Sequence, residues 1–514
     1  GIGLLGGIIG ATLAGSIYAW RYRLPLGRMV DLLAPGLLIG QAIGRIGDII
    51  NGEHLATFTN KPWAFQYTNP GSPAFGQNSM HPAVAYEMGM DAVIFVITYW
   101  LIGRLRPDGM VFAKLLLSPM PHGRVRRVDA SRALAMEGVI DILRAEEVPQ
   151  REGPREACLT DEPHYEGEPV LAIAAISEEI AADAIEAIDV DFEPLPFVLD
   201  PLDSLRPGGP TAYTDGNRFA RAPDAEQGDG PVWSDFKWTE ADFAAIDAGR
   251  MPSDAVAISN WDKGDVDAAF AEADLILEEE IVHQSVTHHP MEPRTNMAYW
   301  ENGKLFAHVS TQSAQRTKAA VAGAVGIDQE DVVLIAPYCG GGFGSKIAGT
   351  TPMQIPAIFS RKINRPVMLR ITRHEEYTNG AARHGFQGRI RLGFREDGKV
   401  LAADIYGLQA NGATTGFPDW RSAGDLVSAL YQPETMRWRG IPVFTNTPPR
   451  SAQRGPGYNQ AAAAIEPLID KAARELGIDR LAIRQLNAPE MNAKVGGDQH
   501  HLSSSYMKEV LEKG

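Results

Sequence analysis

Three short segments of the chain combine glycines with side chains that can bind an anion. The segment VVLIAPYCGGGFGSK (332–346) is an apolar run that ends in a glycine-rich turn. Glycine permits positive φ and lets a ligand approach backbone N–H groups, which suits an anionic cofactor. HVSTQSAQ (308–315) places Gln312 at the end of a predicted strand, and PPRSAQRGPGYNQ (448–460) places Arg454 before a predicted helix N-terminus, where anions also bind. Each segment is weak evidence alone, but together they predict one cofactor site.

Two other groups of residues could carry different chemistry. His283, His288, His289 and Glu292 have the side chains of a zinc site, but adjacent histidines before a proline do not share a helix face as in an H-E-x-x-H motif. Cys339 adjoins the glycine-rich turn, and no His–Cys arrangement would activate it as a nucleophile. Structural roles are favoured for both groups, and we assign no metal-ligating side chain.

With HHPMEPRTNMAYW (288–300) before them, the three segments resemble the molybdopterin-binding large subunit of the xanthine dehydrogenase and aldehyde oxidase family. The resemblance covers about residues 112–514. It implies a molybdenum–molybdopterin cofactor, in its cytosine dinucleotide form. The site residues that it implies are Gln312 beside the molybdenum oxo ligand, Gly341, Gly342, Phe343 and Gly344 close to the metal, with Phe343 near the substrate, and Arg454 with Gly455 on the pterin.

The same resemblance implies an oxidoreductase that hydroxylates an aldehyde or an N-heterocycle with oxygen from water. Two cysteines cannot hold an iron–sulfur cluster, so the electrons would pass to separate iron–sulfur and FAD subunits. Lys346 and Ile347 stand where xanthine-specific enzymes have a glutamate, and Pro456 replaces an aromatic residue, which argues against xanthine. The family's catalytic glutamate, in a Gly-x-Gly-Glu segment, has no counterpart. Glu168 in EGEPV imitates it but begins a predicted strand, so we expect this chain alone to be inactive.

The first hundred residues show a different pattern, that of a membrane protein. Three apolar stretches at about 1–20, 29–50 and 88–103 have lengths close to a bilayer span. Arginines follow the first and the third stretch, as the positive-inside rule requires of cytoplasmic ends. These features predict about three transmembrane helices in a bacterial inner membrane, with the following α/β body in the cytoplasm. The alternative is that they are buried core helices of a soluble protein.

GQAIGRIGDIINGE (40–53) and HPAVAYE (81–87) resemble the signature of prolipoprotein diacylglyceryl transferase. The resemblance implies that Arg45 holds the phosphate of phosphatidylglycerol, and lipid transfer is the alternative function. The alternative for Arg45 is an ion pair with Asp48, three residues along the helix. Asp48, Val84 and Leu5 depart from the family pattern, so lipid transfer by this chain is in doubt. The other residues of the implied lipid site are Asn51, Glu53, His81, Tyr86 and Glu87.

Charge separates the two parts of the chain. The 514 residues carry 48 Lys or Arg and 64 Asp or Glu, a net charge of −16, which argues against a nucleic-acid partner. Residues 1–112 hold seven basic and six acidic side chains, so the excess of acid lies almost wholly in the remainder. RPDGMVF (106–112) fits both resemblances, and we interpret the chain as a chimera, from sequence assembly or from recombination. Whether it is a true fusion stays open.

Hydrophobic patterns predict the elements that position the cofactor segments. EPVLAIAAISEEIAADAIEAIDVDFEP (168–194) reads as strand, helix and strand, with Ser177 as the helix cap. Residues 460–476 predict an amphipathic helix that stops at Gly477. The predicted fold is an α/β hammerhead domain and a truncated molybdopterin-binding α+β domain after the transmembrane helices. The predicted domains are a transmembrane transferase-like fragment (1–111), the hammerhead (112–204), an extended linker (205–262) and the first molybdopterin-binding domain with an incomplete site (263–514).

Overall fold

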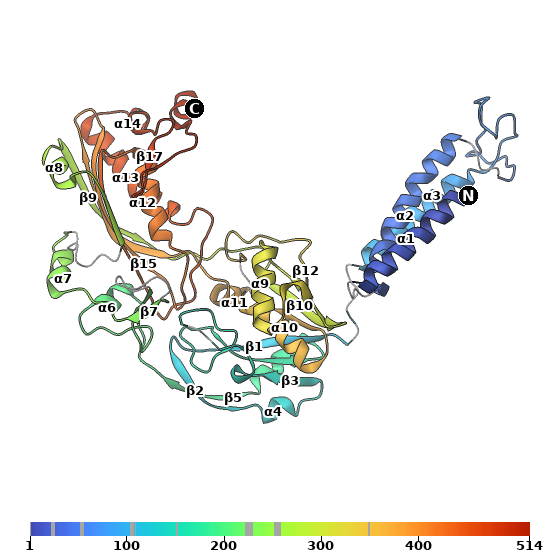
Figure 1. The fold of residues 1–514 in the computed structure, drawn as a ribbon, viewed down its shortest axis with the longest axis horizontal. Helices are drawn as coiled ribbons and strands as arrows, with labels where there is room; N and C mark the ends of the chain where they lie inside the picture. The colour runs from blue at the N-terminus through green and yellow to red at the C-terminus, as the bar shows by residue number, and fades with distance from the viewer. Residues whose placement is uncertain are drawn as a thin grey trace. The chain divides into compact units, whose positions relative to one another are not determined.

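The computed structural model describes residues 2–21, 26–51, 56–102, 107, 109–150, 153–220, 230–250, 259–347 and 350–514. The chain divides into two compact units (Figure 1). The first consists of residues 1–110 with 300–304, and the second of residues 111–299 with 305–514.

The first unit is helical. Helices α2 and α3 pack side by side, and α1 touches α2 less extensively (Figure 1). In the segment between α2 and α3, the buried Met80 forms isolated β-bridges with Phe58 and Phe65. The helices are α1 (Ile2–Arg21), α2 (Leu26–Asn51) and α3 (Ala83–Ile102).

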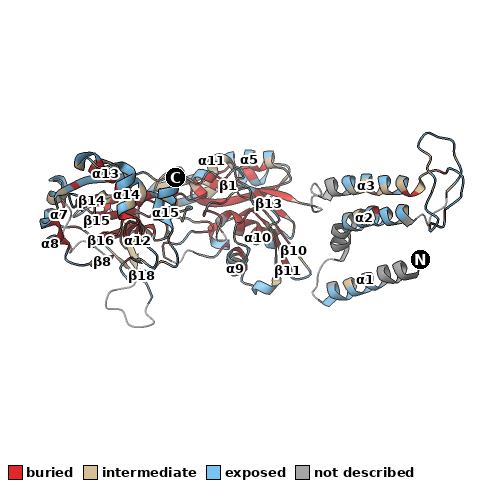
Figure 2. Cartoon of the chain, turned by 90° about the horizontal axis from the view of Figure 1, so that it is seen from above, coloured by how far each residue is buried: buried red, intermediate tan, exposed pale blue. Residues whose placement is uncertain are grey.

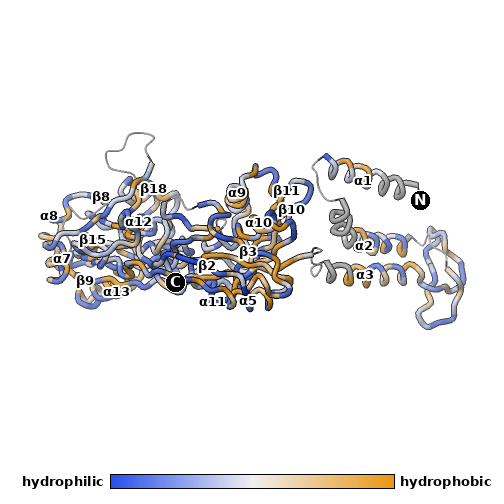
Figure 3. Tube along the Cα trace, turned by 90° about the horizontal axis from the view of Figure 1, so that it is seen from below, coloured by the Kyte–Doolittle hydropathy of each residue, from blue (hydrophilic) through white to orange (hydrophobic). Residues whose placement is uncertain are grey.

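The prediction of transmembrane helices is wrong. Within the described residues, none of the helices combines the length and the apolar character needed to cross a bilayer. In α2, Arg45 and Asp48 interrupt the apolar run, and ionisable groups are costly in a bilayer. Figure 3 shows hydrophobic and hydrophilic positions mixed along the described parts of all three helices. The predicted location in an inner membrane is therefore wrong as well.

The second unit is built on two sheets, and the larger has seven strands in the order β12-β11-β10-β13-β1-β4-β3. Strand β1 pairs antiparallel with β4 and parallel with β13, from Val111 opposite Val367 onward. The predicted hammerhead thus shares one sheet with β10, β11, β12 and β13, which lie much later in the chain. The strands are β1 (Val111–Leu117), β3 (Val139–Leu143), β4 (Pro169–Ala175), β10 (Thr295–Glu301), β11 (Lys304–Val309), β12 (Val332–Ile335) and β13 (Val367–Arg370).

Both faces of this sheet are covered. All seven residues of β4 are buried, as expected for an apolar strand between two layers. On one face Ala172 and Ala174 pack with Phe359 of α10, and on the other Ile173 packs with Ala181 of α5. Figure 2 shows buried residues concentrated along β1 and β13.

The smaller sheet has five strands in the order β8-β16-β15-β14-β9. Helices α12, α13 and α14 contribute to the core on one face, where Ile465 and Ile469 of α13 are fully buried. Ten of the eleven residues of β15 are buried. The strands are β8 (Ser259–Lys263), β9 (Leu275–His283), β14 (Gly385–Phe394), β15 (Val400–Ala410) and β16 (Thr435–Val443).

Short strands and helices complete the second unit. In the described part of residues 205–262, predicted as an extended linker, β6, β7, α7 and the start of β8 alternate with loops. The remaining strands are β2 (Gly123–Asp129) paired with β5 (Asp189–Pro194), β6 (Arg218–Ala220) with β7 (Val232–Ser234), and β17 (Lys494–Val495) with β18 (His500–His501). The helices are α4 (Ser131–Leu134), α5 (Glu178–Glu186), α6 (Pro201–Leu205), α7 (Glu240–Asp247), α8 (Val266–Ala271), α9 (Ala314–Val325), α10 (Thr351–Ile363), α11 (Arg373–Asn379), α12 (Asp419–Tyr431), α13 (Tyr458–Leu476), α14 (Arg480–Asn487) and α15 (Met507–Lys513), with single 3₁₀ turns at η1 (Ala145–Glu147) and η3 (Gln329–Asp331).

The local predictions for two helices are confirmed. Helix α5 begins after Ser177, whose side chain accepts a hydrogen bond from the backbone N–H of Ile180 at 3.2 Å. Helix α13 ends at Leu476, and Gly477 follows in the left-handed conformation with φ of 71°. In both cases the cap residue and the apolar periodicity act together.

Candidate active site

The glycine-rich turn after β12 has a backbone that other residues could not easily adopt. Gly344 has φ of 117°, and a Cβ atom there would lie 1.8 Å from the carbonyl oxygen of Ala452. Phe343 has φ of 54°, which is uncommon for a non-glycine residue and often marks a functional site. Its side chain is 39% exposed. The turn is therefore held in one shape against residues 452–454.

Gln312 lies against this turn. Its side-chain oxygen accepts hydrogen bonds from the backbone N–H of Gly344 at 2.9 Å and of Lys346 at 3.4 Å. A Cβ atom on Gly342 would come within 2.1 Å of the same oxygen, so a side chain at this position would displace the Gln312 amide. Because the oxygen is engaged by the turn, the amide nitrogen of this exposed side chain is the end available to donate to a ligand.

Arg454 reaches the turn from the other side. Its backbone N–H donates to the carbonyl oxygen of Phe343 at 2.7 Å, and its guanidinium carbon lies 5.4 Å from the centre of the Phe343 ring. The Arg383 side chain holds the segment from behind by donating to the carbonyl oxygens of Arg454 at 2.7 Å and Gly455 at 2.9 Å. It also donates to the side-chain oxygen of Gln453 at 2.6 Å.

The structure thus brings together the three segments singled out in the sequence. Gln312 and Arg454, 142 positions apart, both bond to the turn that contains Phe343. An amide donor, an exposed guanidinium and a glycine-rich backbone are groups that suit an anionic cofactor. The roles of the individual residues remain predictions.

An ion pair between the buried Lys346 and the partly exposed Glu292, beneath the turn, escaped the sequence analysis. The Lys346 side chain, 0% exposed, donates to the carboxylate of Glu292 at 3.0 Å and to the hydroxyl of Ser310 at 2.7 Å. The same Glu292 oxygen accepts from Ser310 at 2.7 Å and from the backbone N–H of Gly340 at 2.8 Å. Burial favours the neutral acid, but these hydrogen bonds outweigh it and lower the pKa of Glu292 below its ordinary value. Glu292 therefore fixes the turn and is a weak base.

A second buried pair anchors the end of the same turn. Arg294 and Glu376 form a salt bridge in which both side chains are at most 2% exposed. Arg294 also donates to the carbonyl oxygens of Ser345 and, at 3.0 Å, Gly380. No short motif marks this pair, because its members lie 82 positions apart and meet only in the fold.

The histidines near the site have structural roles. His288 is buried with its two ring nitrogens 3.0 Å from the carbonyl oxygen of Ala452 and 3.3 Å from that of Ala381. Burial is the largest cause that lowers its pKa. The zinc site that His283, His288, His289 and Glu292 could have formed is not present: within the described residues, these side chains are not grouped around a possible metal position. Cys339 is exposed and Cys158 is buried, and burial raises the pKa of the Cys158 thiol.

In the first unit, Arg45 pairs with Asp48 at 2.9 Å and with Glu87 at 2.8 Å. A ring nitrogen of His81 lies 3.3 Å from the hydroxyl of Tyr86. Glu53 and the side chain of Asn51 lie outside the described residues. The intrahelical pair that was the alternative for Arg45 is present, and a lipid site at these residues remains a prediction.

Three family models match parts of the chain. The model described as molybdopterin cofactor-binding domain matches residues 250–488, and the aldehyde oxidase and xanthine dehydrogenase a/b hammerhead domain matches residues 105–196. The model of prolipoprotein diacylglyceryl transferase matches residues 1–120. The last two matches overlap in the segment that contains β1, which belongs to the seven-stranded sheet. Neither the transferase activity nor a chimeric origin is established by this overlap.

Curated relatives match the larger part. The nicotinate dehydrogenase large molybdopterin subunit of Eubacterium barkeri is 26% identical over 416 residues, which are 79% of this chain and 89% of that protein. The carbon monoxide dehydrogenase large chain of Hydrogenophaga pseudoflava is 27% identical over 406 residues, which are 74% of this chain and 47% of that protein. The chain thus spans about half the length of the second relative.

Solved structures share the fold. Quinoline 2-oxidoreductase from Pseudomonas putida 86 has a TM-score of 0.63 and 23% identity over 81% of this chain and 52% of its own. Aldehyde oxidoreductase from Desulfovibrio gigas has a TM-score of 0.65 and 21% identity over 84% of this chain and 45% of its own. The curated relatives described above are dehydrogenases, and the similarity to them and to the cofactor-binding model confirms the prediction of an enzyme of the molybdopterin-dependent class. Residues 105–196 and 250–488 are thus similar to the hammerhead and molybdopterin-binding domains of the xanthine dehydrogenase and aldehyde oxidase family.

Proposed function

We propose that the chain acts within a molybdenum hydroxylase that oxidises an aldehyde or an N-heterocycle with oxygen from water. Electrons would pass to iron–sulfur and FAD subunits, because Cys158 and Cys339 are too few to hold a cluster. The cofactor would be molybdopterin in its cytosine dinucleotide form. The match of residues 250–488 to a molybdopterin cofactor-binding domain supports this proposal.

The main structural support for this proposed function is that Gln312 and Arg454 both form hydrogen bonds with the turn around Phe343. In this proposal the amide nitrogen of Gln312 donates a hydrogen bond to an oxygen of the cofactor. Arg454 balances the negative charge of the pterin part, and Phe343 lines the place of the substrate. When bound, the cofactor supplies the two-electron oxidation of an electron-poor carbon.

The substrate class follows from the neighbouring residues and from the relatives. Ile347 and Pro456 provide neither a carboxylate nor an aromatic ring for a purine. Among the relatives, nicotinate dehydrogenase and quinoline 2-oxidoreductase are named for N-heterocycles, and aldehyde oxidoreductase is named for aldehydes. We therefore favour a small aldehyde or a six-membered N-heterocycle over xanthine.

The general base is proposed to come from another polypeptide segment. Residues 112–514 contain no Gly-x-Gly-Glu sequence. Glu292 lies near the turn, but its salt bridge with Lys346 and its lowered pKa make it unsuited to take a proton. Glu168 is fully buried and accepts a hydrogen bond from the backbone N–H of His164 at 2.6 Å, which is a structural role.

The test is co-expression of the full chain with candidate iron–sulfur and FAD subunits in a host that makes the cofactor. The purified complex should contain molybdenum and reduce an artificial electron acceptor with an aldehyde or a six-membered N-heterocycle such as nicotinate. Xanthine should give much less reduction. A complex that contains molybdenum but oxidises only xanthine would contradict the substrate class, and one without molybdenum would contradict the function.

A further inference from the structure

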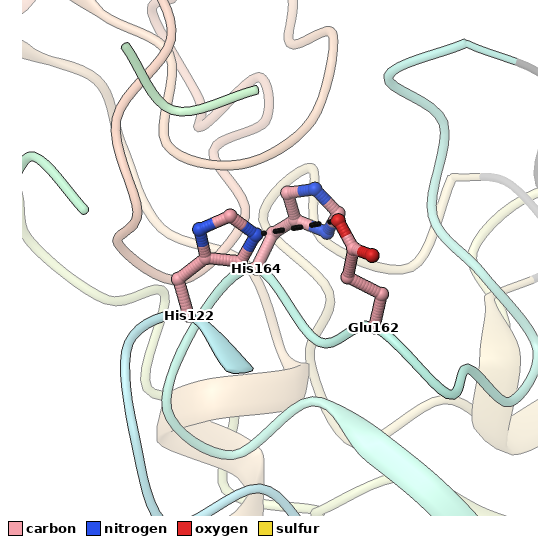
Figure 4. Close-up of side chains that lie close together, drawn as sticks. All are labelled: His122, Glu162 and His164. Carbon is pink, nitrogen blue, oxygen red and sulfur yellow. Dashed lines mark ion pairs between the residues drawn. The ribbon is translucent and has the colours of Figure 1, made fainter. Parts of the chain in front are cut away.

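A group of two histidines and a glutamate lies in the hammerhead region, outside the cofactor segments (Figure 4). His122 directly precedes β2, and Glu162 and His164 belong to the segment before β4. This segment runs beside β2, because Gly123 donates its backbone N–H to Pro163 at 3.1 Å and Val125 donates to Asp161 at 2.7 Å. The backbone pairing therefore sets the side chains of Glu162 and His164 next to His122.

His122 offers a lone pair toward this group. Its Nδ1 atom lies 2.6 Å from the carbonyl oxygen of Pro196, which can only accept a hydrogen bond, so Nδ1 carries the proton. Its Nε2 atom is buried, without a hydrogen-bond partner in the described part of the chain, and lies 3.5 Å from the Glu162 carboxylate. A neutral imidazole would thus turn its lone pair toward a carboxylate. The same Nδ1 contact to a carbonyl is the usual support of a metal-binding histidine.

Glu162 is oriented by Arg124. Its Oε2 atom accepts two hydrogen bonds from the Arg124 guanidinium, at 2.7 and 3.0 Å, while its Oε1 atom is the one that faces His122. One carboxylate oxygen is thereby left for a cation, and the other is held by a partner outside the group. Ligating carboxylates in metal sites are commonly held in this way.

His164 completes the group from a well-anchored position. Its backbone N–H donates to Glu168, and its carbonyl oxygen accepts from the side-chain amide of Asn446 at 3.0 Å. Its ring stacks between those of His122 and Tyr213, with centroid distances of 4.7 and 4.1 Å. One ligand atom from each of His122, Glu162 and His164 lies within 4.8 Å of the other two.

We propose that His122, Glu162 and His164 bind one divalent transition-metal ion, with Zn²⁺ as the ion that best suits two imidazoles and a carboxylate. Ligand atoms around tetrahedral zinc, with bonds of roughly 2.1 Å, lie about 3.4 Å apart. The His122–Glu162 distance of 3.5 Å already fits. Binding draws the His164 nitrogen inward by on the order of 1 Å and turns its ring out of the stack. The ion would tie the start of β2 to the segment before β4 and leave a fourth position for water.

The test uses the full chain after removal of metal by a chelator, with Co²⁺ as a spectroscopic probe and Zn²⁺ as the competing ion. One Co²⁺ per chain should give the visible absorption of a tetrahedral site, and Zn²⁺ should displace it. Glu162→Gln and His122→Ala should each weaken Co²⁺ binding at least about 10-fold. The matched control is His500→Ala combined with His501→Ala, which removes two exposed histidines elsewhere and should leave binding unchanged.

Two results would overturn the proposal. One is the lack of stoichiometric Co²⁺ binding, which would mean that the three side chains do not hold a metal ion. The other is binding that survives Glu162→Gln at full strength. If His122→Ala does not fold, Glu162→Gln decides, because this side chain is 32% exposed and its replacement keeps the shape. Molybdenum content plays no part in the readout, so this test and that of the proposed function fail independently.

Discussion

At the scale of single residues, buried charges hold the glycine-rich turn in place. Lys346 and Glu292 fix its two ends, and Arg294 with Glu376 anchors it to the start of β10 and to α11. Such pairs cost desolvation energy, so they contribute little net stability over an apolar substitute, but removal of one partner leaves the other charge buried alone. The main role of these pairs is therefore to position the glycine-rich turn.

Arg294→Met should destabilise the second unit by about 3–5 kcal/mol, because Glu376 then remains buried without its partner. Urea denaturation measures this change. The matched control is Arg370→Met, which removes an exposed ion pair with Glu178 and should cost about 0–1 kcal/mol. Equal losses in the two variants would contradict the positioning role of Arg294.

Stability should fall as the pH falls, because of two buried histidines. Burial is the main cause that lowers the pKa of His288 and His384 in the folded chain below the ordinary value of 6.5. As the pH drops below that value, the unfolded chain takes up these protons first. The contribution of each neutral histidine to the free energy of unfolding is therefore fully present above pH 6.5. Below that pH it falls by up to about 1.4 kcal/mol per pH unit for each histidine.

The check is urea denaturation of the natural chain and of the double variant His288→Gln with His384→Gln, at pH values of about 7.5 and 5.5. The natural chain should lose more stability between the two pH values than the variant does. An equal loss would mean that other groups carry the pH dependence.

At the scale of elements, the site depends on turns whose backbone only glycine allows. Gly344→Ala should destabilise the fold by about 1–3 kcal/mol and weaken cofactor retention, because its φ is positive and its Cβ would meet the carbonyl oxygen of Ala452. Gly323→Ala is the matched control. It lies in α9 with open space around it and should be stabilising by up to about 1 kcal/mol. Thermal unfolding compares the two, and a neutral Gly344→Ala would contradict the account of the turn.

Elements with strong local signals could be predicted from the sequence, and contacts between distant segments could not. The cap at Ser177 and the apolar spacing of α13 are local, so α5 and α13 were predictable. The pairing of β1 with β13 joins segments more than 250 positions apart and leaves no local pattern. The glycine-rich turn was predictable as a turn, while its anchors Lys346 and Arg294 are recognisable only in the fold. The transmembrane prediction failed because it relied on the apolar content of the helices and gave too little weight to the charged side chains of α2.

At the scale of the whole molecule, the division near residue 110 separates two units with their own packing. The cores of the second unit are formed by residues from 111 onward. Residues 109–514 should therefore fold without the helices. Circular dichroism and urea unfolding of this fragment should match the transition of the second unit in the full chain. A fragment that does not fold would contradict the independence of the two units.

We propose that the segments around Gln312, Phe343 and Arg454 hold a molybdopterin cofactor. Elemental analysis of molybdenum per chain, after co-expression with the iron–sulfur and FAD subunits, tests it most directly. We expect molybdenum close to one per chain for the natural sequence and a loss of most of it in Arg454→Ala. Arg395→Ala, which removes an exposed arginine of a surface ion pair with Glu434, should cause no loss. Molybdenum retained in full by a folded Arg454→Ala variant, or absent from the natural chain in the complex, would contradict it.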